Sequence, residues 1–320
     1  MSNPVWRKRA LVVASGVAVG ALALAGCTPS APAPNESSAN ASIILAEVNE
    51  LSGFNPITSI GGNLDINAKI SYLTRSSFFY IDDKLNVVPD TSFGKIEKIS
   101  DDPLTVEYTL NEGLTWSDGD AIDTDDLLFG WAAMSGYFDD YTLGEDGKIA
   151  SGTQLFDVAG STAGVNSTEV PVGSADKLSL TLTYGTPYVD WNLFQLIDQP
   201  VHVVAEKAGV TVEELITAIT TTPKGDAAAP VTPNPTIKAA ADFWNTGFDV
   251  TSLPDDPSLF LASGPFIVDE WAPTQSVTLK RNDKYTGDLK PSYDEMVIRF
   301  IADSNAQVTA LQNGEVDVIN

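Results

Sequence analysis

Two separate stretches of the sequence alternate apolar and polar residues with a period of two, residues 105–110 and 178–184. Because successive side chains of a strand point to opposite faces, each stretch is predicted to be a strand with one buried face. Between them we expect a helix at about 125–135, which Thr124 or Asp123 can cap and whose acidic first turn suits the helix dipole. Strands and helices are mixed in this way throughout, so the sequence predicts an α/β fold.

Other stretches extend this mixture. A short apolar run with β-branched residues predicts a buried strand at 43–48, and apolar residues at helical spacing predict a helix at 68–81. Residues 139–175, rich in Gly, Asp, Ser and Thr, are predicted to be a long surface loop or an insertion. Further elements are expected in the second half of the chain: helices from the capping box at 211–214, just before Gly247 and from 304, and strands at 277–279 and 297–301.

The charge balance restricts the partners of this chain. It has 43 acidic and 18 basic side chains and a formal net charge of −25. A surface this negative repels phosphate backbones and argues against binding of DNA or RNA. One cysteine cannot form an internal disulfide or a thiolate metal site, and one histidine cannot form a multi-histidine metal centre. We therefore expect neither a metal site nor a cofactor.

The first 26 residues have the three-part form of an export signal. A basic region at 7–9 precedes an uncharged apolar stretch at 10–25, and Cys27 follows directly after two small residues. The apolar stretch is short for a membrane span, although an uncleaved transmembrane anchor is the alternative. Residues 27–41, in which Pro, Ser, Ala and Asn dominate, are predicted to be a flexible tether.

Residues 24–27, Leu-Ala-Gly-Cys, resemble the lipobox of bacterial lipoproteins. The resemblance implies that residues 1–26 are removed as a signal peptide and that Cys27 carries the lipid. Two or more acyl chains hold a protein stably at a membrane, whereas one chain holds it only marginally. Removal of the signal takes away three positive charges and no negative ones, so the mature chain would carry −28. The expected location is extracytoplasmic, anchored to the cell membrane through Cys27.

Several motifs in the mature chain form a set. One covers residues 110–129, around Trp116-Ser117-Asp118-Gly119. The others are Phe54-Asn55-Pro56, Ser263-Gly264-Pro265-Phe266, Arg281-Asn282-Asp283-Lys284-Tyr285 and Gly314-Glu315-Val316-Asp317. In order and spacing they resemble family 5 solute-binding proteins, the peptide- and nickel-binding components of ABC importers, from about residue 42 to the end. The first motif departs from the family pattern at Glu112, Trp116 and 123–125.

The resemblance implies a periplasmic-binding-protein-like fold of type II with an extra subdomain, in which two lobes close around a ligand. It assigns 42–82 and 198–320 to lobe I and 83–197 to an inserted subdomain. In the family, the chain crosses into lobe II just after the segment that matches 314–317. We therefore expect lobe II to be absent from this chain, as in a fragment or a truncated protein, which leaves half of a binding site.

The same resemblance places the loop after Asn55-Pro56 at the edge of the cleft. The predicted ligand-binding residues are those of this loop, Ser59, Ile60, Gly61, Gly62 and Asn63. Glycines let a backbone approach a ligand closely, and exposed amides can pair with a peptide main chain, although an ordinary turn is an equal alternative. Trp131 and Tyr137 could also face the cleft, but aromatics at helical spacing belong more often to a core.

The sequence contains no recognisable catalytic constellation. His202 is the only imidazole and lies between apolar residues, which favours a structural role over a functional one. The aspartates between 118 and 126 could bind calcium, but they lack EF-hand spacing, and a solvated loop with a helix cap is favoured. A secreted lipoprotein hydrolase, the alternative from another class, would need His202 as the base that activates a nucleophile.

Together these observations favour a substrate-binding lipoprotein of an ABC importer that binds oligopeptides and delivers them to the permease, without enzymatic activity. Within the family, nickel complexes and oligosaccharides are the alternative ligands. A non-transporting surface lipoprotein is a third hypothesis beside the hydrolase. The expected partners are a peptide ligand, the ABC permease subunits and the membrane that holds the lipid, and the expected state is a monomer.

Overall fold

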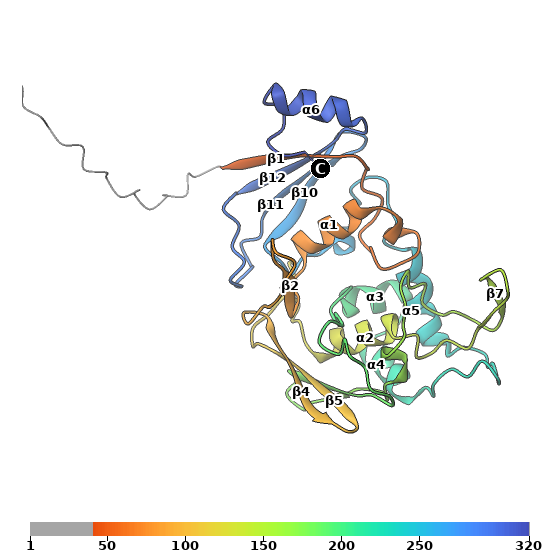
Figure 1. Ribbon diagram of the computed structural model, residues 1–320. Coiled ribbons are helices and arrows are strands. Elements are labelled where there is room, and N and C mark those ends of the chain that lie inside the picture. Colours follow the sequence, from red (N-terminus) through yellow and green to blue (C-terminus); the bar gives the residue numbers. More distant parts are fainter. Residues whose placement is uncertain (1–40, 320) are drawn as a thin grey trace, which may run out of the picture. The chain divides into compact units, whose positions relative to one another are not determined.

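The computed structural model of the protein describes residues 41–319 (Figure 1). The predicted signal peptide at 1–26, Cys27 and the tether up to residue 40 lie outside the described residues. The described part belongs to one compact unit in which helices and strands are mixed, so the predicted α/β class is confirmed. The boundaries of lobe I (42–82 and 198–320) and of the inserted subdomain (83–197) stay predictions.

A four-stranded sheet joins residues from both ends of the described chain. Its order is β1-β12-β11-β10, with β1 parallel to β12 and the other two pairs antiparallel. The strands are β1 (Ser42–Glu47), β10 (Phe266–Ala272), β11 (Ser276–Arg281) and β12 (Glu295–Phe300). The first strand of the fold is therefore held in place by the last one.

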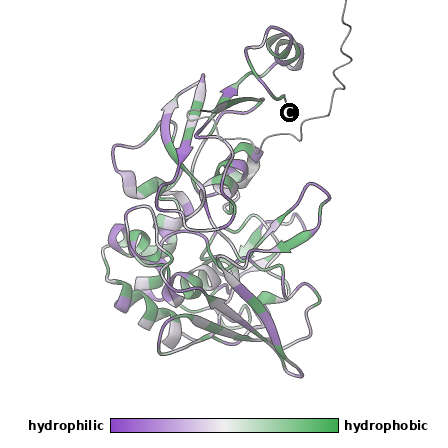
Figure 2. Cartoon of the chain, turned by 90° about the vertical axis from the view of Figure 1, so that its left-hand side faces the viewer, coloured by the Kyte–Doolittle hydropathy of each residue, from purple (hydrophilic) through white to green (hydrophobic). Residues whose placement is uncertain are grey.

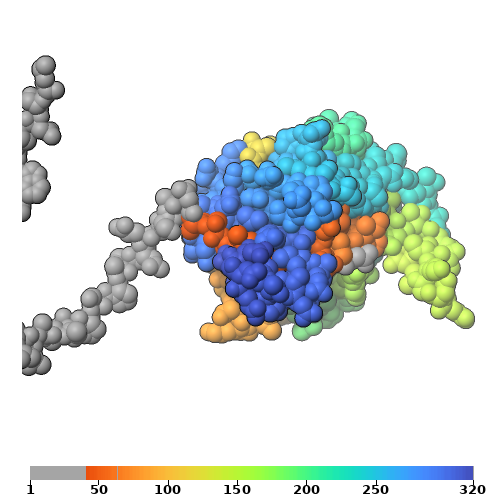
Figure 3. Space-filling view, turned by 90° about the horizontal axis from the view of Figure 1, so that it is seen from above, coloured from red at the N-terminus to blue at the C-terminus, as the bar shows by residue number. Residues whose placement is uncertain are grey.

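The two faces of this sheet contact different helices. Leu45 and Ile298, which are paired in register, line a hollow together with α1 (Asp65–Thr74). Ala46 points to the other face, because strand side chains alternate, and packs with Ala310 of α6 (Ser304–Gln312). Figure 3 looks onto α6 and shows residues of β1 beside it.

A second sheet is antiparallel throughout, in the order β4-β5-β9-β8. Its strands are β4 (Gly94–Asp101), β5 (Leu104–Leu110), β8 (Val172–Gly173) and β9 (Ser179–Thr183). Along β5, every second residue from Leu104 to Leu110 is buried and the residues between are partly exposed. The predicted strands at 105–110 and 178–184, each with one buried face, are thus confirmed.

Four helices pack on one another beside this sheet. α2 (Thr124–Met134) contacts β9 and α4 (Val212–Thr221), and α5 (Pro235–Thr246) contacts α3 (Val201–Ala208) and α4. Figure 2 shows hydrophobic and hydrophilic residues on the same helices, as expected for helices with one buried side. A capping box begins α4 at Thr211, as the sequence predicts, and another begins α2 at Asp123, one of the two caps expected there.

The remaining elements are short. They are β2 (Phe79–Ile81), β3 (Val87–Pro89), β6 (Thr142–Leu143), β7 (Ile149–Ser151) and the 3₁₀ turns η1 (Gly61–Asn63), η2 (Val165–Ser167) and η3 (Pro257–Phe260). Within the described range, none of the helices combines the length and the apolar character that crossing a bilayer requires.

Three predictions from the sequence differ from the structure. The stretch 139–175, predicted as a surface loop, contains β6, β7, η2 and β8, and its residues Leu155, Phe156 and Val165 are buried. The helix predicted at 68–81 begins at Asp65 and ends at Thr74, because Arg75 adopts an extended backbone and residues 79–81 pair with β3. The helix predicted from the capping-box form of 304–307 is present, but its cap is Asp303, whose side chain accepts from the Ala306 N–H.

Candidate functional site

A hollow of about 490 Å³ lies between α1, β2 and the residues that precede α3, and we call it the α1–β2 hollow. Its lining residues come from within seven segments, 56–57, 68–77, 79–80, 90, 195–198, 265–266 and 285–291. This volume is in the range of small-molecule sites, about 300–1,000 Å³. The hollow is therefore large enough to take part of a ligand.

Much of the wall of the α1–β2 hollow is aliphatic or aromatic. Tyr72 is 56% exposed and Leu289 is 38% exposed, while Phe79 and Leu73 are partly buried. A ligand that covers these side chains removes apolar surface from water, which stabilises a complex by about 25 cal/mol per Å². The wall thus favours a ligand with an apolar part.

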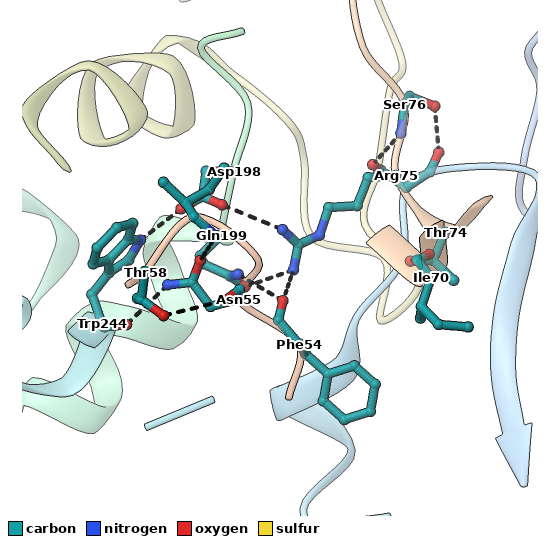
Figure 4. Close-up of polar contacts among 12 residues, drawn as sticks. Phe54, Asn55, Thr58, Ile70, Thr74, Arg75, Ser76, Asp198, Gln199 and Trp244 are labelled. Atoms are coloured by element: carbon teal, nitrogen blue, oxygen red, sulfur yellow. Dashed lines mark hydrogen bonds and ion pairs between the residues drawn. The ribbon is translucent and has the colours of Figure 1, made fainter. Parts of the chain in front are cut away.

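A buried ion pair fixes one side of this hollow (Figure 4). Nη1 of Arg75 lies 3.3 Å from Oδ1 of Asp198, and the two side chains are 11% and 2% exposed. Nη2 of Arg75 donates to the carbonyl oxygen of Phe54 at 2.7 Å and to Oε1 of Gln199 at 2.9 Å. Arg75 therefore ties the end of α1 to the Phe54 turn and to the segment before α3.

Further hydrogen bonds complete this network. Nε1 of Trp244 donates to Oδ2 of Asp198 at 2.6 Å, and Nδ2 of Asn55 donates to the Trp244 carbonyl at 2.9 Å. Burial raises the pKa of Asp198, an effect that the positive charge of Arg75 and the indole N–H partly offset. Burial likewise lowers the pKa of Arg75, against the attraction of Asp198. Both charged groups are thus engaged inside the protein.

Other polar side chains, both uncharged and charged, also line the α1–β2 hollow. The hydroxyl of Ser77 donates to Oε1 of Gln195. Asp90, the third charged residue of the lining, is 5% exposed, and its Oδ1 accepts from the backbone N–H of Ser92 at 3.0 Å and from the Ser92 hydroxyl at 2.5 Å. Because a side-chain amide has both donors and an acceptor, Gln195 can pair with a peptide group.

The predicted ligand-binding loop, Ser59, Ile60, Gly61, Gly62 and Asn63, lies next to Pro56 and Ile57, which line the hollow. The hydroxyl of Ser59 donates to Oδ2 of Asp157 at 2.5 Å. The backbone N–H groups of Gly61 and Gly62 donate to the hydroxyl and carbonyl of Thr58, and the Gly61 carbonyl accepts from Asn67. Ile60 is 56% exposed. Ligand contact by this loop stays a prediction.

The two aromatic residues considered for the cleft belong to the core. Trp131 is 0% exposed, and its Nε1 donates to the Thr168 hydroxyl at 2.8 Å. Tyr137 is 9% exposed and packs against the Trp131 ring, with centroids 4.9 Å apart. The core interpretation of these aromatics therefore fits the structure.

His202 of α3 lies between two carboxylates of the turn before α2. Its Nε2 is 3.0 Å from Oδ2 of Asp118 and its Nδ1 is 3.0 Å from Oδ2 of Asp120. Both ring nitrogens thus have partners, whereas a general base needs one nitrogen directed at a nucleophile. This arrangement fits a structural histidine and gives the hydrolase hypothesis no support.

The other three aspartates between residues 118 and 126 lie at the start of α2. Asp123 and Asp126 form its capping box, and Asp125 pairs with Lys177 at 2.6 Å. Across residues 41–319, no three side chains of His, Cys, Asp or Glu are grouped in a way that could hold a metal ion. The cap interpretation of the aspartates is therefore the one that the structure supports.

The sequence model described as "Bacterial extracellular solute-binding proteins, family 5 Middle" matches residues 91–320. The chain belongs to this family. Members of family 5 bind solutes and are not enzymes. A lipoprotein of Mycobacterium leprae without assigned function is 26% identical over 306 residues, which are 94% of this family 5 chain and 48% of the relative. The oligopeptide-binding protein OppA of Bacillus subtilis is 23% identical over 236 residues, which are 73% of this chain and 36% of OppA.

Solved structures agree with this fold. The periplasmic EDTA-binding protein EppA superposes with a TM-score of 0.65 at 22% identity, over 89% of this family 5 chain and 45% of EppA. The oligopeptide-binding protein AppA of Bacillus subtilis, solved with a nonapeptide, gives a TM-score of 0.56 at 18% identity, over 86% and 43% of the two chains. The family 5 chain therefore has the fold of a periplasmic binding protein and spans about half the length of the relatives it matches.

A second, more apolar hollow of this family 5 chain has a volume of about 510 Å³. It lies between α1 and the β1 side of the sheet, where Val318 joins β1 through a parallel bridge to Leu45. Its charged lining residues are Glu47 and Lys69, which form an ion pair at 2.5 Å. This hollow adjoins the α1–β2 hollow, since Ala68, Tyr72 and Leu73 line both.

Sequence reasoning missed the buried ion pair that fixes the α1–β2 hollow of the family 5 chain, although the motif residues Pro56, Pro265, Phe266 and Tyr285 do line this hollow. Arg75, Asp198 and Gln199 lie in stretches far apart in sequence and match none of the motifs discussed above. The available signals were a charged residue within the helix expected at 68–81 and an acidic residue within the mostly apolar stretch 196–204. A charge in such a setting is rarely buried without a partner.

Proposed function

We propose that this chain serves in an extracytoplasmic solute-binding lipoprotein of an ABC importer, and that its ligands are oligopeptides. The α1–β2 hollow carries the proposal, because it combines apolar walls with the Gln195 amide in a chain of family 5. A peptide offers an apolar side chain, which the walls of the hollow can cover, and a main chain, which can form hydrogen bonds with the Gln195 amide. Binding is reversible and includes no covalent step.

Peptides fit this chain better than the other family ligands do. OppA and AppA are named as oligopeptide-binding proteins, EppA as an EDTA-binding protein, and NikZ of Campylobacter jejuni was solved with a nickel–histidine complex. The single histidine of this chain has both ring nitrogens against Asp118 and Asp120 and lies outside the hollow lining. Direct coordination of nickel by this part of the chain therefore has no support among the described residues.

We further propose that a lipid on Cys27 holds the protein at the outer face of the cell membrane, where it meets the permease as a monomer. The support comes from the lipobox form of residues 24–27 and from relatives named as lipoproteins. Anchoring keeps the binder close to the permease, which raises the effective concentration of the pair. The role of the loop Ser59–Asn63 at the cleft edge remains part of this proposal.

Calorimetric titration of the purified chain tests the proposal. The probes are an equimolar pool of pentapeptides, maltotriose and nickel–EDTA. Saturable binding of the peptide pool, together with a rise in melting temperature at saturating peptide, is the expected result. Saturable binding of maltotriose or nickel–EDTA alone would replace peptides as the ligand class. No binding of any probe would overturn the binding function of this chain.

A further inference from the structure

Three charged residues line the α1–β2 hollow, Arg75, Asp90 and Asp198, and each is already engaged. Arg75 and Asp198 pair with each other. Asp90 holds the backbone N–H and the hydroxyl of Ser92 and is 5% exposed. Within the lining, no cation is therefore left to receive an anionic group, and a ligand charge placed here would lose its water without gaining an opposite charge.

The net charge of the whole chain also disfavours anionic ligands. With a formal net charge of −25, the protein repels anions on approach and attracts cations. The acidic surface can favour peptides with a positive charge outside the hollow. It cannot favour an anionic metal chelate inside it.

The apolar side chains of the wall offer a ligand the contacts that the engaged charged residues cannot. Phe79, Tyr72 and Leu289 face the hollow, and the last two are 56% and 38% exposed. An aliphatic or aromatic side chain that enters would cover them. The hydroxyl of Ser77 donates to Oε1 of Gln195, so the amide nitrogen of Gln195 can serve as a donor for a main-chain carbonyl beside that side chain.

We infer that the α1–β2 hollow receives one uncharged apolar side chain of a peptide, and that it discriminates against acidic side chains and against anionic chelates. This inference rests on the proposed function and specifies the ligand for the same site. It sets the chain apart from binders whose ligands are negatively charged complexes.

The test is a calorimetric titration with four matched probes. Three are the peptides Gly-Gly-X-Gly-Gly with Phe, Leu or Glu at X, and the fourth is nickel–EDTA. The Phe and Leu peptides are expected to bind at least tenfold more tightly than the Glu peptide, and nickel–EDTA is expected not to bind. Each titration is repeated with Leu289→Asp, which places a carboxylate in the wall, and with the control Leu193→Asp.

The two variants form a matched pair. Leu289 and Leu193 are 38% and 40% exposed, so we expect both substitutions to leave the fold intact, but only Leu289 lines the hollow. Leu289→Asp is expected to weaken the Phe and Leu peptides at least tenfold, and Leu193→Asp to leave their affinities within twofold. Melting temperatures of both variants confirm folding independently of binding.

The outcomes separate the inference from the proposed function. Equal affinity for the three peptides, or equal effects of the two variants, would overturn the inference while peptide binding stands. Binding of nickel–EDTA in preference to every peptide would overturn both the inference and the peptide part of the proposed function. If none of the four probes binds, both the inference and the binding function of this chain are wrong.

Discussion

Trp244 donates its indole N–H to one oxygen of Asp198 at 2.6 Å, and the other oxygen of that carboxylate lies 3.3 Å from Arg75. The carboxylate is thus held from two sides by α5 and by the end of α1. The fully buried position of Trp244 and the 2% exposure of the Asp198 side chain keep water from replacing either partner. The geometry of the α1–β2 hollow depends on this contact, because both charged residues line it.

Asp198→Ala is expected to destabilise the protein by about 3–5 kcal/mol, because it leaves the buried guanidinium of Arg75 without an opposite charge. Urea unfolding followed by fluorescence measures the loss. The control is Asp242→Ala, which removes the exposed pair of Lys238 and Asp242 and should cost no more than about 0.5 kcal/mol. Equal losses of stability in the two variants would show that the buried pair stabilises the protein no more than the exposed pair does.

The buried carboxyl group of Asp126 leads us to predict that the stability of the protein depends on pH. It is 2% exposed, and burial raises its pKa from 3.8 to about 7, although the N–H groups of Val201, Asp123 and Trp116 oppose the shift. Between pH 4 and pH 7 the unfolded chain releases this proton and the folded chain keeps it. The stability contribution is therefore complete below pH 4 and is lost as the pH rises toward 7, by about 1.4 kcal/mol per pH unit.

Asp126→Asn provides the comparison, since an amide keeps an oxygen acceptor and does not titrate. Urea unfolding of both proteins at pH 5 and pH 7 measures the difference in their free energies of unfolding. We expect wild type to lose about 2–3 kcal/mol relative to the variant between these two values. Parallel pH curves would mean that the three N–H donors keep the carboxylate charged throughout this range.

The proposed membrane anchor gives a prediction that depends on the sulfur atom of Cys27. Cys27→Ser removes the sulfur that the lipid requires, so the exported protein should move from the membrane fraction to the soluble fraction. Cell fractionation followed by a carbonate wash measures the distribution. Ser30→Ala, three residues further along the predicted tether, is the control and should remain with the membrane. Retention of Cys27→Ser in the membrane pellet would contradict the lipoprotein assignment.

The parts of the fold that follow from local patterns could be predicted. The alternation at 105–110 fixes which residues of β5 are buried, and the side chains of Asp123 and Thr211 determine where α2 and α4 begin. These signals lie within a few residues of the element they describe. The family motifs likewise predicted the fold that the comparisons show.

The candidate site depends on contacts that no local pattern contains. Arg75 meets Asp198 across 123 positions of sequence, and this contact is formed where α1 ends seven residues before the predicted end of the helix. The resemblance placed residues 59–63 at the cleft edge, where exposed amides could pair with a peptide, yet the amides of Gly61 and Gly62 donate to Thr58, just before this loop. Their partners became visible only in three dimensions.

Gly61 supplies the last prediction. A Cβ added there would lie 1.9 Å from the carbonyl oxygen of Asn55, so Gly61→Ala must displace the turn that carries Pro56 and Ile57 into the hollow. We expect a loss of about 1–3 kcal/mol in urea unfolding and weaker peptide binding. Gly160→Ala is the control, because nothing lies within 4 Å of its added Cβ. If both alanine variants unfold and bind like wild type, the close packing of this loop is not needed for the site.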